Sequence, residues 1–144
     1  ARILNKGTNQ KKTRKKLFGV PLEDVVVREG KAVPGIVTDA IGQIEARGLR
    51  TKGIFRVPGN QARLNVLRDM YDEGKQVDLS QEKVHDVCAI LKLYFRELPE
   101  PLLTYKMYPY FVGVAELSME EAKPLYYRML CRCLPMHSLL LLRK

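Results

Sequence analysis

The sequence has no tryptophan, no long apolar run and no secretory signal. Even the four consecutive leucines at residues 139–142 fall far short of the ~18 apolar residues that a membrane-spanning helix needs. The N-terminus is basic, but no apolar segment follows it, which excludes a signal peptide in this stretch. Because the chain begins with Ala1 rather than Met, we expect it to be a piece of a longer protein.

Cysteine is scarce, and its count is odd: Cys88, Cys131 and Cys133. Without a secretory signal, this count indicates free thiols in a reducing compartment, so we expect a cytoplasmic protein. The spacing of Cys131, Cys133 and His137 could suggest a zinc site. However, no fourth ligand is evident and Cys133 continues an apolar helical stripe, so we predict no metal site.

The remaining composition is that of a folded domain. Hydrophobic residues make up 46% of the 144 residues and charged residues 28%, which excludes a mainly disordered chain. This length supports one domain with a single core.

The positive charge is concentrated at the N-terminus. Residues 1–16 contain seven Lys and Arg and no acidic residue, although the formal net charge of the whole chain is only +9. We predict a basic flexible arm or linker over residues 1–16, and a folded domain over residues 17–144. The arm could contact an anionic membrane, at about 1 kcal/mol per cation, or serve as a nuclear import signal. Nucleic-acid binding is disfavoured, because no aromatic residues are interleaved for base stacking.

Apolar spacing, proline and glycine predict helices in the first half of the chain. Apolar residues recur at helical intervals over residues 33–48, with Pro34 in the first turn and Gly48 at the C-terminal end. Asn60 is a candidate N-cap for a second helix, which Gly74 ends.

The second half is also predicted to be helical. A third helix covers about residues 82–97, because Pro99 and Pro101 cannot continue it. A shorter helix covers about residues 105–115, where Pro109 marks either a kink or the true start.

Two further helices complete an all-α prediction. Ser118 and Glu121 are spaced as a capping box for a helix that ends at Pro135, and another helix begins near Ser138. The three valines at residues 25–27 are the only strand-like run. The sequence therefore predicts an all-α fold.

No motif for self-contained catalysis is present. The sequence has neither a G-x-x-x-x-G-K-[ST] phosphate loop nor a G-x-S-x-G nucleophile motif. With His85 and His137 as its only histidines, a histidine-based triad has little to draw on. We therefore expect that the protein is not an enzyme in its own right.

Three cations remain as candidate functional residues. The segment GIFRVPGN places Arg56 in a loop between two glycines, and Lys92 and Arg96 lie one helical turn apart on one face. On spacing alone, all three could instead be solvated surface residues. Arg96 would then pair with Glu97 or Glu100.

Several segments together resemble the Rho-type GTPase-activating (RhoGAP) domain over residues 17–144. The landmarks follow the order of the family: FGVPL at 18–22, VPGIV at 33–37, IEARGL at 44–49, GIFRVPG at 53–59, VHDV at 84–87 and LKLYFRELPEPLL at 91–103. The resemblance implies a RhoGAP-type helical bundle, in agreement with the helix pattern above.

The resemblance also implies a role for each cation. Arg56 would be an arginine finger, supplied to a Rho, Rac or Cdc42-type GTPase in its GTP-bound state to accelerate hydrolysis and so switch off signalling. Lys92 and Arg96 would steady the finger loop and bind the GTPase. No cofactor of this chain's own is implied, because the partner GTPase would carry GTP and Mg²⁺.

Neighbouring residues take supporting roles under the same resemblance. The loop would be anchored by Phe55 and Val57 and bent at Gly53 and Gly59, and the helix exit beside the interface would be shaped by Pro99 and Pro101.

Two features depart from the family pattern. Pro58 stands where the family often has Ser, which stiffens the loop. The family domain continues past Lys144, and a later helix supplies an Asn to the interface. We therefore expect a bundle that is incomplete at its C-terminal end. The alternative function is a catalytically weak or inactive fragment that acts as a GTPase-binding or scaffold module.

Overall fold

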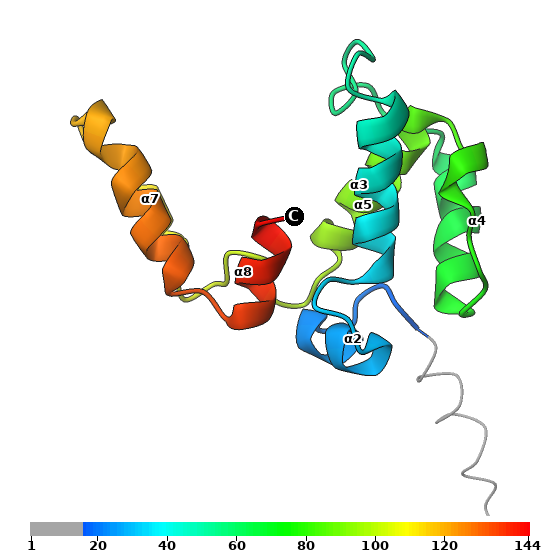
Figure 1. The fold of residues 1–144 in the computed structure, drawn as a ribbon, viewed down its shortest axis with the longest axis horizontal. Helices are drawn as coiled ribbons and strands as arrows, with labels where there is room; N and C mark the ends of the chain where they lie inside the picture. The colour runs from blue at the N-terminus through cyan, green and yellow to red at the C-terminus, as the bar shows by residue number, and fades with distance from the viewer. Residues whose placement is uncertain (1–15) are drawn as a thin grey trace, which may run out of the picture.

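The computed structural model describes residues 16–144, and every regular element in that range is a helix (Figure 1). In chain order the α-helices are α2 (Leu22–Glu29), α3 (Gly35–Arg47), α4 (Gln61–Asp72), α5 (Val84–Arg96), α6 (Tyr108–Ala115), α7 (Lys123–Arg132) and α8 (Met136–Leu142). Short 3-10 turns at Leu79–Gln81 and Glu120–Ala122 precede α5 and α7. The all-α prediction is confirmed. The predicted arm lies outside the described residues, apart from Lys16.

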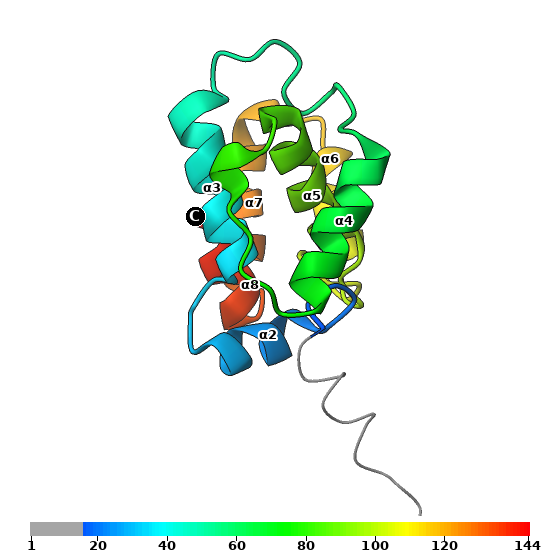
Figure 2. The same cartoon turned by 90° about the vertical axis from the view of Figure 1, so that its right-hand side faces the viewer.

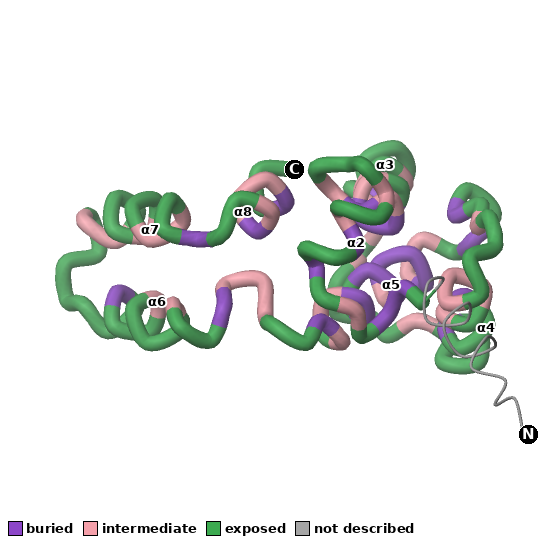
Figure 3. The backbone as a smooth tube through the Cα atoms, turned by 90° about the horizontal axis from the view of Figure 1, so that it is seen from below, coloured by how far each residue is buried: buried purple, intermediate pink, exposed green. Residues whose placement is uncertain are grey.

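Helix α5 is the centre of the core. It packs against both α3 and α4, which flank it in Figure 2. Most of its surface is covered, as Figure 3 shows, and its buried apolar residues are Val87, Cys88, Ile90, Leu91, Leu93 and Tyr94. Its exposed side carries Lys92 and Arg96. The two cations therefore stand on the best-packed helix of the described chain.

An aromatic contact joins the segment before α2 to this core. The Phe18 ring is fully buried and lies edge-on to the Tyr94 ring, with centroids 5.9 Å apart. Asp72, at the end of α4, accepts the backbone N–H groups of Leu17 and Phe18 at 2.8 Å each. The Arg68 guanidinium lies 5.8 Å from the centre of the Phe18 ring. These contacts fix the start of the described chain against α4 and α5.

The strand-like interpretation of residues 25–27 is wrong, because these valines lie within α2. Pro21 precedes the helix, and Gly30 ends it with a left-handed φ of 63°. Val25 is fully buried whereas Val27 is 75% exposed. β-branched residues lower helix propensity only slightly, so burial of one helical face outweighs their preference for strands.

The predicted ends of the next two helices are confirmed. Pro34 immediately precedes α3 and Gly48 follows it. Asn60 caps α4, since its side-chain oxygen accepts the backbone N–H of Arg63 at 3.1 Å. Gly74 follows α4 with a φ of 70°. The third predicted helix begins slightly later than expected, because a 3-10 turn occupies the chain before α5.

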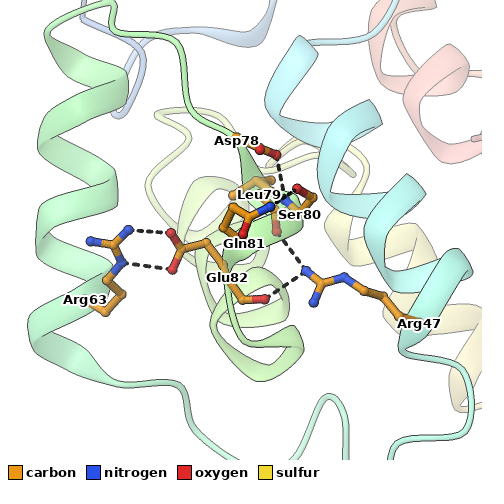
Figure 4. Close-up of polar contacts among 7 residues, drawn as sticks. All are labelled: Arg47, Arg63, Asp78, Leu79, Ser80, Gln81 and Glu82. Atoms are coloured by element: carbon orange, nitrogen blue, oxygen red, sulfur yellow. Dashed lines mark hydrogen bonds and ion pairs between the residues drawn. The ribbon is translucent and has the colours of Figure 1, made fainter.

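A polar network ties α3 and α4 to the entry of α5 (Figure 4). Glu82 is only 8% exposed, and its carboxylate accepts two hydrogen bonds from the Arg63 guanidinium. Arg47 donates from one nitrogen to the carbonyl oxygens of Leu79 and Glu82, at 2.8 Å each. Hydrogen bonding from Arg63 lowers the pKa of Glu82, and Glu82 raises the pKa of Arg63. The network fixes the start of the helix that carries Lys92 and Arg96.

Helices α6 and α7 form a hairpin that stands away from α3, α4 and α5 (Figures 1 and 3). Within the hairpin, the rings of Phe111 and Tyr127 stack with centroids 6.2 Å apart. All residues of α7 are described and none is buried. Its apolar stripe includes Leu125, Tyr126 and Met129, which are 58%, 43% and 54% exposed. The hairpin therefore adds little to the core that supports α5.

The prediction of a capping box at residues 118–121 is wrong. A 3-10 turn occupies this segment, and α7 begins only at Lys123, with Pro124 in its first turn and no side-chain cap. Helix α6 likewise begins at Tyr108 with Pro109 in its first turn, so this proline marks the true helix start.

Candidate functional site

The loop between α3 and α4, residues 48–60, stands above the ends of α3 and α5 (Figure 1). It leaves α3 at Gly48, where a Cβ would lie 2.5 Å from Ile54 Cδ1 and 2.9 Å from Val84 Cγ2. Only glycine allows this approach. Ile54 packs against the hydrophobic core and so holds the first half of the loop.

Arg56 is held in a tight turn that begins at Gly53. Gly53 has a left-handed φ of 68°, and its carbonyl oxygen accepts the backbone N–H groups of Arg56 and Val57 at 2.9 and 2.8 Å. The Arg56 guanidinium folds back to within 3.6 Å of the position that a Cβ of Gly53 would occupy. Gly53 therefore forms a bend in the loop.

Lys92 holds the loop from outside. Its Nζ donates to the backbone carbonyl oxygen of Phe55 at 2.9 Å, joining positions 37 residues apart in the sequence. Because Phe55 directly precedes Arg56, this bond fixes the chain beside the exposed arginine. The structure thus brings together the two cation-bearing segments that the sequence singled out.

The loop exit is held by Asp86, whose Oδ1 accepts the backbone N–H of Asn60 at 2.6 Å. Gly59 lies directly over this contact. A Cβ there would lie 2.8 Å from both Ala89 Cβ and Asp86 Oδ1. Gly59 has no positive φ, so its role is close approach to α5 rather than the bend that was predicted.

The predicted anchoring by Phe55 and Val57 side chains is wrong. Phe55 is 55% exposed and Val57 is 41% exposed, whereas Ile54 packs against the core. Sequence alone favoured the residues that flank Arg56 on both sides. The structure anchors Phe55 through its backbone carbonyl and leaves its ring at the surface.

Arg96 is exposed one turn beyond Lys92, and the two acidic residues that the alternative interpretation would pair with it are engaged elsewhere. Glu97 accepts from Arg68 across to α4 at 2.8 Å. Glu100 accepts the backbone N–H of Tyr105 at 2.7 Å. Within the part of the chain that the structure describes, Arg96 makes no ion pair.

The two prolines after α5 lie differently. Pro99 is exposed, while Pro101 is partly covered, and its carbonyl oxygen accepts the N–H of Thr104 at 2.8 Å. Leu98, immediately before Pro99, is buried, at 7% exposed, and it pins the exit of α5 to the core. The prolines therefore follow the cation-bearing face on a fixed segment of chain.

The site carries its positive charge on exposed side chains. Among the described residues, Arg56, Lys92 and Arg96 are exposed and form no ion pair with an acidic side chain, so no neighbouring carboxylate neutralises their charge. No group of three or more His, Cys, Asp or Glu in residues 16–144 could hold a metal ion. Cys88, below Lys92 on α5, is buried, and burial raises the pKa of its thiol. Such a surface is suited to stabilising an anion carried by another molecule.

Comparison with known proteins then gives the family. The family model described as "RhoGAP domain" matches residues 34–144, which is more than half of the chain. The chain belongs to the RhoGAP domain family. Its RhoGAP match includes the loop of Arg56, the whole of α5 and the hairpin of α6 and α7.

Curated relatives agree with this assignment. The RhoGAP chain is 38% identical over 130 residues to "Rho GTPase-activating protein gacJJ" of Dictyostelium discoideum, covering 90% of this chain and 15% of that protein. It is 42% identical over 108 residues to human "Rho GTPase-activating protein 45", covering 74% of this chain and 10% of that protein. It therefore spans a small part of the length of the curated relatives that it matches.

A solved structure shows the same fold. The crystal structure of human Rho GTPase activating protein 15 superposes with a TM-score of 0.83 and 32% identity. The match covers 96% of this chain and 68% of that one. The predicted RhoGAP-type bundle is confirmed, and the separate boundary predicted between residues 16 and 17 stays a prediction.

Asp86 and Gly48 were missed as parts of this site. The sequence analysis includes Asp86 only within the landmark at residues 84–87, and it assigns Gly48 only to a helix end. One signal was available for Asp86, since it is an acidic residue that falls on the buried face of an apolar helix, where a charge needs a partner. For Gly48 no local signal reveals that Ile54 and Val84 crowd it.

No helix in residues 16–144 has the length and apolar character needed to cross a membrane.

Proposed function

We propose that this chain is a GTPase-activating domain that binds a Rho-family small GTPase in its GTP-bound state and supplies Arg56 as an arginine finger. Membership of the RhoGAP family supports a GTPase-activating role. The observation that carries the finger assignment is the bond from Lys92 Nζ to the Phe55 carbonyl oxygen. It holds an exposed arginine at a fixed place on the α5 face.

The proposed chemistry is electrostatic stabilisation in trans. During phosphoryl transfer, negative charge spreads over the oxygens of the transferred group, and the planar Arg56 guanidinium can bond two of them at once. A finger of this kind contributes about 10³–10⁵ in rate, equivalent to roughly 4–7 kcal/mol of barrier. GTP and Mg²⁺ belong to the partner, so this chain needs no cofactor.

The proposed binding face extends from the loop along α5. Lys92 and Arg96 present positive charge to the GTPase, and Pro99 and Pro101 fix the direction in which the chain leaves the helix. Lys92 has two roles in this proposal: it holds Phe55 and adds charge to the face. Arg96, which makes no ion pair among the described residues, is available for a partner.

Single-turnover GTP hydrolysis by Rho, Rac and Cdc42-type proteins, with and without the chain, tests the proposal. We expect Arg56→Ala to remove the acceleration and to leave binding of the GTP-bound GTPase largely intact. Arg50→Ala is the matched control, because Arg50 is another exposed arginine of the same loop.

The alternative is a non-catalytic GTPase-binding or scaffold module. It predicts that Arg56→Ala changes nothing, whereas substitutions of Lys92 and Arg96 weaken binding. Retention of full acceleration by Arg56→Ala would exclude the finger mechanism. Binding without any acceleration by the unmodified chain would favour the scaffold.

As an accessory activity, we propose that residues 1–16 contact anionic membrane surfaces and so recruit a cytoplasmic protein. The support is their seven cations without an acidic residue. Sedimentation with phosphatidylserine vesicles at low and high salt, with and without residues 1–16, tests this. Equal binding after the deletion contradicts it, and tighter binding to RNA or DNA than to vesicles favours a nucleic-acid role instead.

A further inference from the structure

Asp86 is a buried carboxylate that the proposed mechanism does not use. It is 4% exposed, and its Oδ1 accepts the backbone N–H of Asn60 at 2.6 Å. Asn60 is the residue at which the finger loop ends and α4 begins. Asp86 therefore touches the backbone of the loop from below, on the side of the core.

Asp86 and Lys92 hold the loop at two separated points of one helix. They lie six residues apart on α5, which is about 9 Å along the helix axis. The chain between their contacts, from Phe55 to Asn60, can span about 17 Å when extended. The segment is therefore longer than the axial separation of its two contact residues on α5. We call residues 55–60 the arch, and Arg56 lies near its start.

The close approach of Gly59 to α5 leaves the backbone of the arch little conformational freedom. A Cβ on Gly59 would lie 2.8 Å from Asp86 Oδ1 and 2.8 Å from Ala89 Cβ. Pro58 fixes its own φ and biases Val57 toward an extended conformation. Because the loop is also fixed at Asn60, these restrictions limit the backbone conformations that the chain can adopt between Arg56 and Asn60.

Asp86 is itself held firmly. It lies in the first turn of α5, where a carboxylate is favoured by the helix dipole. It is also near enough to Arg63 to contribute, after Glu82, to raising the pKa of that arginine. A short bond from a buried anion to a backbone N–H is stronger than a neutral one, so the contact is suited to positioning.

We propose that Asp86 is a positioning residue for Arg56: by holding the backbone N–H of Asn60, it sets the arch that presents the finger to the nucleotide of the bound GTPase. This inference rests on the proposed GTPase-activating function. Asp86 does not touch the reacting groups. It acts through the loop.

The experiment compares Asp86→Ala and Asp86→Asn in single-turnover hydrolysis over a range of concentrations of the chain. We expect Asp86→Ala to lower the maximal rate about 10- to 100-fold, with the half-saturating concentration changed less than about threefold. Asp86→Asn keeps an acceptor oxygen, and it should restore most of the rate.

Asp72→Ala is the matched control, because Asp72 also accepts backbone N–H groups, at Leu17 and Phe18, but far along the sequence from the finger loop. It should lower stability without changing the maximal rate of the folded fraction. If Asp72→Ala and Asp86→Ala lower the rate equally at matched folded fraction, Asp86 is merely structural and the inference fails.

A double-mutant cycle separates the two proposals. If Asp86 acts through Arg56, Arg56→Ala/Asp86→Ala should be no slower than Arg56→Ala. A further loss in the double variant contradicts the inference. If Arg56→Ala itself retains full acceleration, the finger mechanism is wrong, whatever Asp86 does.

Amide hydrogen exchange provides a readout that does not depend on hydrolysis. We expect Asp86→Ala to speed exchange across residues 53–60, above all at Asn60, while Asp72→Ala and Asp86→Asn leave it near the unmodified rate. Unchanged exchange at these residues in Asp86→Ala would overturn the inference even if no tested GTPase responds to the chain.

Discussion

Lys92 Nζ lies 2.9 Å from the carbonyl oxygen of Phe55, so the residue that precedes Arg56 is bonded to α5 and not only to its own loop. Loops owe much of their mobility to the absence of such links. Here an exposed arginine is attached to the most buried helix of the described chain.

Lys92→Met should uncouple the loop from α5 while keeping most of the apolar length of the side chain. The Phe55 carbonyl then loses its donor, and the finger is less well placed, so we expect roughly a tenfold or greater fall in the maximal rate of activated hydrolysis. Single-turnover kinetics measure this. Lys31→Met, at an exposed lysine between α2 and α3, should leave the rate unchanged. Equal rates for both variants would contradict a role for the Lys92 bond.

Gly59→Ala should both destabilise the domain and slow activation. The new Cβ meets Ala89 and Asp86 at 2.8 Å, and relief requires the loop to move outward, at a cost of about 1–3 kcal/mol. Chemical denaturation gives the free energy of unfolding. Gly42→Ala is the control, because nothing lies within 4 Å of its Cβ position in α3. That substitution should stabilise the helix by about 0.5–1 kcal/mol. A neutral Gly59→Ala would show that the contact has room to relax.

Glu82→Gln should weaken the junction of α4 and α5. The Arg63 guanidinium keeps a neutral partner, but the charge of a nearly buried carboxylate is lost, so we expect a loss of about 1–3 kcal/mol near neutral pH. Glu120→Gln is the control, because its ion pair with Lys123 leaves the Glu120 side chain 77% exposed. Such a pair contributes little, and its loss should change stability by less than about 1 kcal/mol.

The pH dependence of the Glu82 effect has a definite sign. Arg63 lowers the pKa of Glu82 in the folded protein from its ordinary value of 4.5. The stabilisation is therefore fully present above pH 4.5 and is lost as the pH falls through the lowered folded-state pKa. The stability gap between the unmodified chain and Glu82→Gln should be constant near neutral pH and close in acid. A gap that widens on acidification would contradict this assignment.

Polar substitution of the exposed stripe on α7 should cost little. Leu125→Gln and Met129→Gln remove side chains that are 58% and 54% exposed, so we expect changes in unfolding free energy of at most about 0.5 kcal/mol. Leu67→Ala in α4, where the leucine is fully buried, should cost about 2–5 kcal/mol. Thermal or denaturant unfolding distinguishes the two cases. A large loss at Leu125 would mean that α7 is packed against another surface in solution.

Much of the fold could be predicted from the sequence because the ends of helices depend mainly on nearby residues. Pro34, Asn60 and Gly74 set helix ends through their own backbone preferences, and such preferences can be read from neighbouring residues alone. The helical conformation of the three valines in α2 could not be predicted from neighbouring residues. Their strand propensity is a weak term, and burial of Val25 against distant parts of the chain outweighs it.

For the candidate site, too, some features could be predicted from the sequence and others could not. Arg56, Lys92 and Arg96 are predicted as site residues from the family resemblance, and the structure adds the Lys92 contact with Phe55. The misassigned anchors, Phe55 and Val57, depended on which side of a non-repetitive loop faces the core. Helix periodicity gives no guide to that choice. Ile54 takes the anchoring place, since it packs against the core directly after the bend at Gly53.

The crowding at Gly48 limits how far the length of the loop at residues 48–60 can vary. The loop is fixed at Gly48, at Phe55 and at Asn60, so an inserted or deleted residue between these points cannot be absorbed by slack at the ends. Surface loops usually tolerate such changes well. We therefore expect one-residue insertions to be far more harmful at residues 53–59 than in the connection at residues 74–78. Among related sequences, we then expect the loop that carries Arg56 to keep a constant length, whereas the neighbouring connections vary in length.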